Sequence, residues 1–136
     1  MRVIKFRGKS LNTGLWVYGD LTQRGKRMFI EYEVNPETIG QFIGLFDKNG
    51  QEIYEGDIVR KITKSGYPDN FVGEIVFRNG LFGFKNDNQY GLPVSIIVKS
   101  SKWVDGNASG TSTYEYEVIG NIYDDTELLK EYDKDF

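Results

Sequence analysis

Carboxylates next to glycine-containing turns are the first candidates for chemistry in this chain. Glu55 and Asp57 lie on either side of Gly56, and two neighbouring carboxylates can transfer protons or hold a magnesium ion. Asp beside Gly is also a common turn former, because its side chain accepts hydrogen bonds from nearby backbone amides. The sequence leaves both interpretations open, and we favour the turn.

A second group of polar residues, Asp47-x-Asn49-Gly50, partly matches a calcium-binding loop. An EF-hand loop also needs a further ligand, a glycine at a later position and a distal glutamate between two helices. These features are missing, so we expect Asn49 and Gly50 to form a turn. We expect no metal ion and no cofactor.

The composition excludes several classes of active site. The chain contains no Cys and no His, so disulfides, thiolate nucleophiles, Cys/His zinc sites and histidine-based proton transfer are impossible. An enzyme with this sequence would depend on carboxylates. Whether the protein is an enzyme is uncertain from the sequence, and we expect that it is not.

The charges of the chain are separated between its two ends. Residues 1–27 carry seven basic side chains and one acid, a balance of +6, and residues 115–136 carry eight acids and two bases, a balance of −6. The ends can attract each other within a chain or between subunits, or the basic end can meet nucleic acid or an acidic protein. Exposed ion pairs contribute only about 0–1 kcal/mol each, so this polarity informs the choice of partner more than stability.

Basic and aromatic side chains of a predicted N-terminal hairpin are the candidate binding residues. Arg24, Lys26 and Arg27 are expected at its tip, where they can contact phosphate groups or protect a sheet edge. Nearby aromatic rings can form a stacking platform for bases, or they can be one face of an amphipathic hairpin. These aromatic residues are Trp16, Tyr18, Phe29 and Tyr32.

Short apolar segments between turns predict a mainly β protein. The first predicted strand spans residues 2–7 and buries Ile4 and Phe6, and the next two form an antiparallel hairpin that turns at residues 23–26. Leu128, Leu129 and Tyr132 predict a short C-terminal helix. Asp124 or Asp125 can cap it, and Glu127 follows Asp124 at the spacing of a capping box. The predicted strands are 2–7, 15–21, 27–33, 41–46, 51–54, 58–62, 72–77, 81–84, 94–99 and 114–119.

Two further turns punctuate the middle of the chain. Gly56-Asp57 precedes one strand, and Asn79-Gly80 is the pattern of a two-residue hairpin turn. The short strands with glycine at their bends, from about Gln41 to Phe84, are similar to SH3-like barrels. We therefore expect an SH3-like barrel core with the N-terminal hairpin packed on it.

The stretch GQFIGLFDKNGQEIYEGDIV, residues 40–59, resembles the hallmark of the YopX-like proteins of bacteriophages and prophages. Residues 4–7, 36–41 and 116–123, with Leu128-Leu129, also resemble that family in the same order, so the resemblance covers nearly the whole chain. It implies a small phage-borne protein of mainly β structure whose biochemical activity is not established. It supplies no catalytic residues.

The length and the N-terminal residues complete the sequence-based expectations. A chain of 136 residues fits one domain, and no apolar run of signal-peptide length begins it. We expect a single YopX-like domain in the cytoplasm of the bacterial host. We favour a non-enzymatic binding or accessory protein that acts through protein partners or self-association. The alternatives are a nucleic-acid-binding module that uses the basic hairpin and a metal-dependent enzyme that uses carboxylates.

Overall fold

The computed structural model describes residues 2–63, 71–78, 80–85 and 114–133. Its strands form three sheets with antiparallel pairing, and one short α-helix follows the last strand. The predicted mainly β class and C-terminal helix are therefore confirmed. Within the described ranges, no helix has the length and apolar character needed to cross a membrane.

The N-terminal lobe contains a hairpin and a three-stranded sheet. Its strands are β1 (Phe6–Lys9), β2 (Trp16–Gly19), β3 (Thr22–Arg24), β4 (Arg27–Ile30) and β5 (Tyr32–Val34). β1 pairs with β2, and β4 lies between β3 and β5. Ile30 and Val34 are fully buried and approach β1 closely, since a Cβ added at Gly8 would lie 3.2 Å from Val34 Cβ. Glycine in β1 thus lets the two sheets pack.

Three features of this lobe differ from the prediction. The segment 15–21, expected to form a hairpin with residues 27–33, instead contains β2, which pairs with β1, while the hairpin partner of β4 is β3. Ile4 was expected in the core but is 52% exposed, whereas Arg7 is only 5% exposed. Arg7 is buried because it finds an ionic partner, Asp57, which hydrophobic alternation does not reveal. The expected strand over residues 27–33 is broken at Glu31, whose φ of 61° lies in the left-handed region and turns β4 into β5.

The C-terminal lobe is built on a four-stranded sheet in which the strands Leu81–Lys85, Phe71–Arg78, Asp57–Thr63 and Tyr114–Asn121 lie side by side in that order. Its core is a cluster of buried side chains to which β7 contributes Ile53, with Val59, Ile75, Phe84 and Tyr116 from the sheet. The helix α1 (Leu128–Asp133) contacts β9. The strands are β7 (Glu52–Tyr54), β8 (Asp57–Thr63), β9 (Phe71–Arg78), β10 (Leu81–Lys85) and β11 (Tyr114–Asn121).

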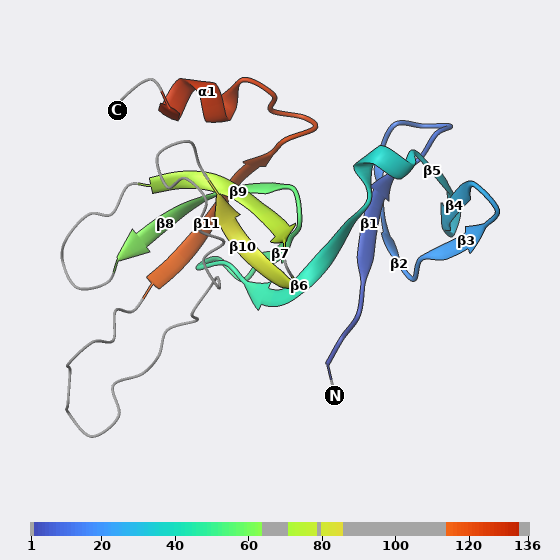
Figure 1. Ribbon diagram of the computed structural model, residues 1–136, viewed down its shortest axis with the longest axis horizontal. Helices are drawn as coiled ribbons and strands as arrows, with labels where there is room; N and C mark the ends of the chain where they lie inside the picture. The colour runs from blue at the N-terminus through green and yellow to red at the C-terminus, as the bar shows by residue number, and fades with distance from the viewer. Residues whose placement is uncertain (1, 64–70, 79, 86–113, 134–136) are drawn as a thin grey trace.

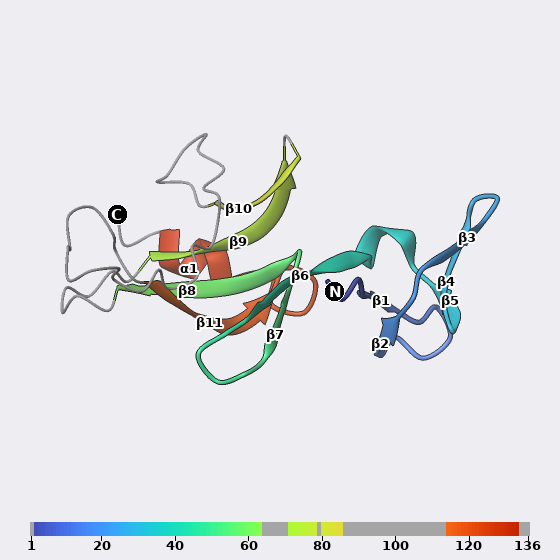
Figure 2. The same ribbon diagram turned by 90° about the horizontal axis from the view of Figure 1, so that it is seen from below.

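The strand β6 (Gly40–Phe46) connects the two lobes. It follows a 3-10 turn, η1 (Pro36–Thr38), pairs with β1 at its start and then pairs with β7. Figures 1 and 2 show the lobes on opposite sides of this strand, with the hairpin of β3 and β4 at the far end of the molecule. The strand is long enough to carry contacts for both lobes.

The strands do not close into a barrel in the described part of the chain. One sheet ends at β10 and β11, while β7 pairs with β6 in another. The SH3-like barrel expected from Gln41 to Phe84 is therefore not confirmed. β8 pairs with β9 on one side and, on the other, with β11, which comes from well outside that window. The predicted strand 94–99 and the side chain of Asn79 lie outside the described residues, although Arg78 pairs with Leu81 around the turn that contains Gly80.

Candidate functional site

The solvent-facing side of the sheet β3-β4-β5 carries two of the predicted basic residues. The cross-strand register pairs Arg24 with Arg27 and Phe29 with both Thr22 and Glu33. Since alternate residues of a strand share a face, these five side chains lie on one surface, which we call the outer face. Ile30 and Val34 point to the opposite, buried side.

Both arginines of the outer face lie over one aromatic ring. The guanidinium carbons of Arg24 and Arg27 are 5.6 Å and 5.2 Å from the centroid of Phe29. Arg27 also donates two hydrogen bonds to Glu33, from Nε at 3.0 Å and from Nη2 at 2.8 Å, and this contact lowers the pKa of the Glu33 carboxyl. Arg24 and Lys26 form no ion pair within the described residues. In the described part of the chain, the tip therefore offers two cations that have no ionic partner.

Trp16 and Tyr18 lie away from this tip, at the junction of the two lobes. The Trp16 ring meets Tyr123 at 5.7 Å and donates from Nε1 to Asp124 at 2.8 Å. Tyr18 is 49% exposed and contacts Tyr54 at 5.6 Å. The structure therefore does not bring Trp16 or Tyr18 together with Arg24, Lys26 and Arg27.

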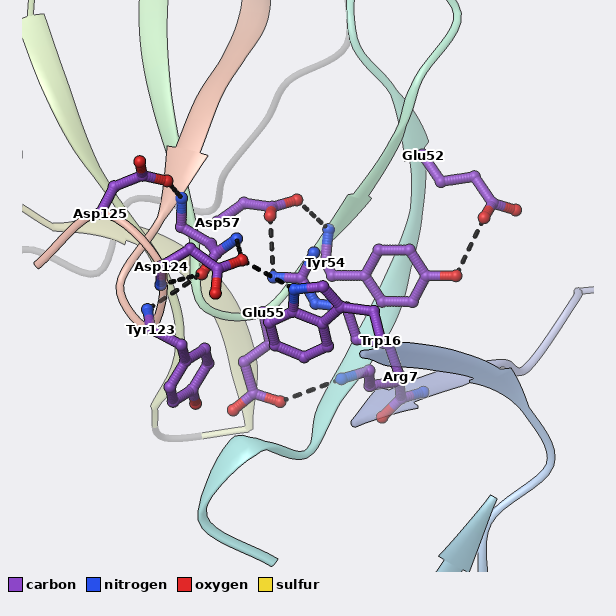
Figure 3. A network of polar contacts seen from close by, with 11 residues as sticks. Arg7, Trp16, Glu52, Tyr54, Glu55, Asp57, Tyr123, Asp124 and Asp125 are labelled. Carbon is purple, nitrogen blue, oxygen red and sulfur yellow. Dashed lines mark hydrogen bonds and ion pairs between the residues drawn. The ribbon is translucent and has the colours of Figure 1, made fainter. Parts of the chain in front are cut away.

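The junction is centred on the buried ion pair of Arg7 and Asp57 (Figure 3). Arg7 Nη2 lies 2.8 Å from Asp57 Oδ1, and both side chains are over nine-tenths buried. The guanidinium is held between Trp16 and Tyr54, with ring centroids 4.6 Å and 4.9 Å from its carbon. Burial raises the pKa of the Asp57 carboxyl, while Arg7 and the Tyr54 amide oppose this shift.

The carboxylates considered for catalysis or metal binding have separate structural contacts. Asp57 Oδ2 accepts from the Tyr54 amide at 2.7 Å, whereas Glu55 accepts from the Gln41 amide at 3.3 Å. Asp47 accepts from three backbone amides, those of Asn49, Gln51 and Val118. The described residues contain no cluster of three or more carboxylates that could hold a metal ion.

The glycines assigned to turns have positive φ angles. Gly50, Gly56 and Gly80 have φ of 82°, 93° and 79°. A Cβ added at Gly56 would lie 3.1 Å from the Tyr123 ring, whereas one added at Gly50 would meet nothing within 4 Å. The Asn49 amide donates to Asp47 Oδ1 in the same turn as Gly50.

Comparisons with known proteins place this arrangement in a family. A sequence model described as YopX protein matches residues 5–130. The chain belongs to the YopX family. No curated protein matches it. The crystal structure of protein EF1440 from Enterococcus faecalis is similar to this YopX chain, with a TM-score of 0.51 and 21% identity over 95% of this chain and 99% of that chain. At this identity the likeness shows the fold alone.

Sequence reasoning about the YopX chain missed how its junction is assembled. Lys9 and Trp16 both bind Asp124, although the sequence predicted Trp16 as a binding residue and Asp124 as a helix cap. Asp124 also accepts a hydrogen bond from the Asn121 side chain. The helix begins later, at Leu128. The opposite charges of the chain ends were the available signal. One ion pair, between Lys9 and Asp124, joins residues 1–27 to residues 115–133 in the described chain.

The Asp124 contacts predict an acid-sensitive contribution to the stability of the YopX chain. Hydrogen bonds from Lys9, Trp16 and Asn121 lower the pKa of Asp124 from 3.8 to about 2. Because the folded-state pKa lies below the unfolded value, this stabilisation is present above the unfolded pKa and is lost as pH falls towards 2. Asp124→Asn should therefore lower the free energy of unfolding by up to about 1 kcal/mol at pH near 6, since the group is partly exposed.

Urea unfolding of wild type and Asp124→Asn at a pH near 6 and a pH near 2.5 would test this. The difference between the two proteins should shrink at the lower pH. Asp20→Asn is a matched control, because Asp20 is exposed. An Asp124→Asn effect of the same size at both pH values would contradict the assignment.

Proposed function

We propose that this YopX-family chain is a phage- or prophage-borne accessory protein that acts by binding other proteins, with the outer face as its contact surface. The observation that carries this proposal is the pair of arginines, Arg24 and Arg27, over the Phe29 ring. Arginine and aromatic side chains are enriched among the residues that dominate protein–protein binding energy. A stacked guanidinium also keeps its N–H donors available at its edge, where carboxylates of a partner can bind.

The charge balance of the outer face favours a protein over a nucleic acid. Glu33 already pairs with Arg27, which leaves Arg24 and Lys26 for phosphate groups. Two phosphate contacts would weaken nucleic-acid binding only about tenfold between about 50 and 200 mM salt, far less than in proteins that make many such contacts. Glu33 itself would repel a phosphate. A protein surface that carries both carboxylates and apolar groups complements this face better.

The edge of the same sheet offers a second means of contact. All three residues of β3 are exposed, and β4 is the neighbour of β3 among the described strands. Exposed strand edges can pair with an extended segment of a partner. Main-chain pairing at β3 would place such a segment beside Arg24.

Binding measurements with substitutions on the outer face test this function. Proteins captured from host or phage-infected lysate would be identified, purified and titrated against wild type and the Arg24→Ala/Arg27→Ala variant. A second copy of the chain would be tested by light scattering. We expect the variant to bind its partner at least about 30-fold more weakly, since one interface hot spot is worth about 2 kcal/mol or more. Lys130→Ala on α1 is the control and should bind like wild type.

A nucleic-acid arm of the experiment distinguishes the main alternative. Anisotropy titrations with single- and double-stranded DNA and RNA at low and high salt should show no binding that depends on Arg24 and Lys26. Steeply salt-dependent binding that is lost in Arg24→Glu/Lys26→Glu would assign the face to nucleic acid. A protein partner that binds wild type and Arg24→Ala/Arg27→Ala equally would show that the contact surface lies elsewhere.

A further inference from the structure

An open pocket of about 340 Å³ lies at the junction of the lobes, on the side away from Asp124. One wall comes from Lys5 and β1–β2, and the other from β7 and the residue before it. Figure 3 shows Arg7, Tyr54 and Glu52 of these walls. The volume is at the lower end of the range of small-molecule sites. The lining residues are Lys5, Arg7, Tyr18, Gln51, Glu52 and Tyr54.

Several hydrogen-bond donors of this pocket have no partner among the described residues. Each oxygen of Glu52 has a partner, because Oε1 accepts from the Tyr54 hydroxyl at 2.9 Å and Oε2 lies 2.6 Å from Lys5 Nζ. An ammonium group has three donors, so Lys5 keeps two. The hydroxyl of Tyr18 makes no hydrogen bond within the described residues. The pocket can therefore satisfy a ligand that brings acceptor oxygens.

The pocket is also lined by the buried guanidinium of Arg7, which has N–H groups that make no hydrogen bond with the described residues. Arg7 is 5% exposed, and neither its Nε nor its Nη2 makes a hydrogen bond with the described residues. Nη2 is close enough to Asp57 for an ion pair, but its N–H is not directed at the carboxylate. Buried polar groups without hydrogen bonds are rare and require an explanation. A ligand oxygen near this wall would offer a hydrogen-bond acceptor to the Arg7 guanidinium.

The rings of Tyr18 and Tyr54 supply an apolar surface beside the donors. Their centroids are 5.6 Å apart with planes tilted by 59°, and Tyr18 is half exposed while Tyr54 is buried. A planar ligand can pack on Tyr18 while its charged end reaches Lys5. The Tyr18 ring and the Lys5 ammonium group together fit a small molecule with an apolar body and a terminal oxyanion.

We propose that this pocket binds a small ligand that carries a carboxylate or phosphate group, with Lys5 as the principal cationic contact and Tyr18 as the packing surface. Glu52 competes with the ligand for Lys5. The site is separate from the outer face of β3-β4-β5, so it goes beyond the proposed protein-binding function. Either proposal can fail without the other.

An NMR titration of the full chain with sodium benzoate tests the site. Benzamide is the neutral counterpart of benzoate, and inorganic phosphate tests the oxyanion without a ring, all at constant ionic strength. We expect benzoate to shift the backbone amide signals of Lys5, Tyr18 and Gln51, and benzamide to shift them at least fivefold less at equal concentration. Phosphate that binds as well as benzoate would overturn the role of Tyr18 as the packing surface. Phosphate that binds more weakly would support a role for the Tyr18 ring.

Two variants of the pocket should change benzoate affinity in opposite directions. Lys5→Met should weaken binding at least fivefold, because it removes the exposed cation. Glu52→Gln should strengthen it at least threefold, because it removes the competing charge while its amide oxygen still accepts from Tyr54. Lys130→Met, which also removes one positive charge but lies exposed on α1, should leave affinity unchanged. Equal binding of benzamide and benzoate, or an affinity unaltered by Lys5→Met in a folded variant, would overturn the proposal.

Discussion

Arg7→Met is expected to lower the free energy of unfolding by about 3–5 kcal/mol, because it leaves the buried carboxylate of Asp57 without its partner. The exposed fractions of the two side chains are 7% and 2%, so water cannot replace the guanidinium. Methionine keeps much of the volume between Trp16 and Tyr54. For a chain of this length the loss corresponds to a fall in melting temperature of roughly 10–20 °C. Chemical denaturation and thermal unfolding would measure both.

The pH dependence of this loss separates a charge effect from a packing effect. Burial already raises the pKa of Asp57 in the wild type, where Arg7 opposes the shift. Without Arg7 the folded-state pKa rises further, so the penalty is present at neutral pH and is relieved as pH falls through that pKa and Asp57 takes up a proton. The destabilisation by Arg7→Met should therefore be smaller near pH 4 than near pH 7.

The double variant Arg7→Met/Asp57→Asn provides the control. Replacing both charges removes the stranded carboxylate, so part of the stability lost in Arg7→Met should return. The amide oxygen of the introduced asparagine can still accept from the Tyr54 amide. A double variant as unstable as the sum of the two single variants would show that the pair does not interact.

The second large effect is expected at Gly56. Replacement by Val should cost more than about 3 kcal/mol, since the position combines a φ of 93° with a close approach to Tyr123. The backbone of Gly56 cannot shift to relieve the strain without breaking two hydrogen bonds. Its amide donates to Ile75 at 2.8 Å, and its carbonyl accepts from Ile122 at 3.0 Å. Denaturant unfolding of Gly56→Val would measure the loss.

Gly50→Val is the matched comparison. Gly50 has a similar φ of 82° but open space around the added Cβ, so only the conformational cost of about 1–2 kcal/mol applies. Gly50→Asn should be closer to neutral, because Asn tolerates the left-handed region. Equal losses in Gly50→Val and Gly56→Val would show that contact with Tyr123 contributes nothing.

The turns and some of the short strands of this fold were predictable from the sequence, because interactions between neighbouring residues determine them. Gly25 lies between β3 and β4 and Gly80 between β9 and β10, so the chain reverses where the turn patterns predict. The predicted partner of the first hairpin, residues 15–21, instead contributes β2, which pairs with β1. The pair β6–β7 around Asp47 is also where the alternation of apolar segments and turn residues placed it. Each of these elements depends on a few neighbouring residues.

The remaining features depend on which distant residues meet, and no local pattern specifies that. Nothing near Arg7 indicates that Asp57 will neutralise it, and β11 reaches β8 from the other end of the chain. Trp16 looked like a surface platform because aromatic residues next to basic ones have that composition whether they face solvent or another lobe. Its partner, Asp124, is 108 positions away.

The contacts of Asp124 and the central position of β8 matter for the newly made chain. Lys9 and Trp16 emerge from the ribosome more than a hundred residues before the carboxylate that binds them, and β8 has only β9 as its sheet neighbour until β11 is synthesised. Contacts of such high sequence separation form slowly, and an unpaired strand edge can join another chain in the meantime. A translation product that stops before Tyr114 would therefore be prone to aggregate, because the segment from β11 to Asp124 completes both lobes at once.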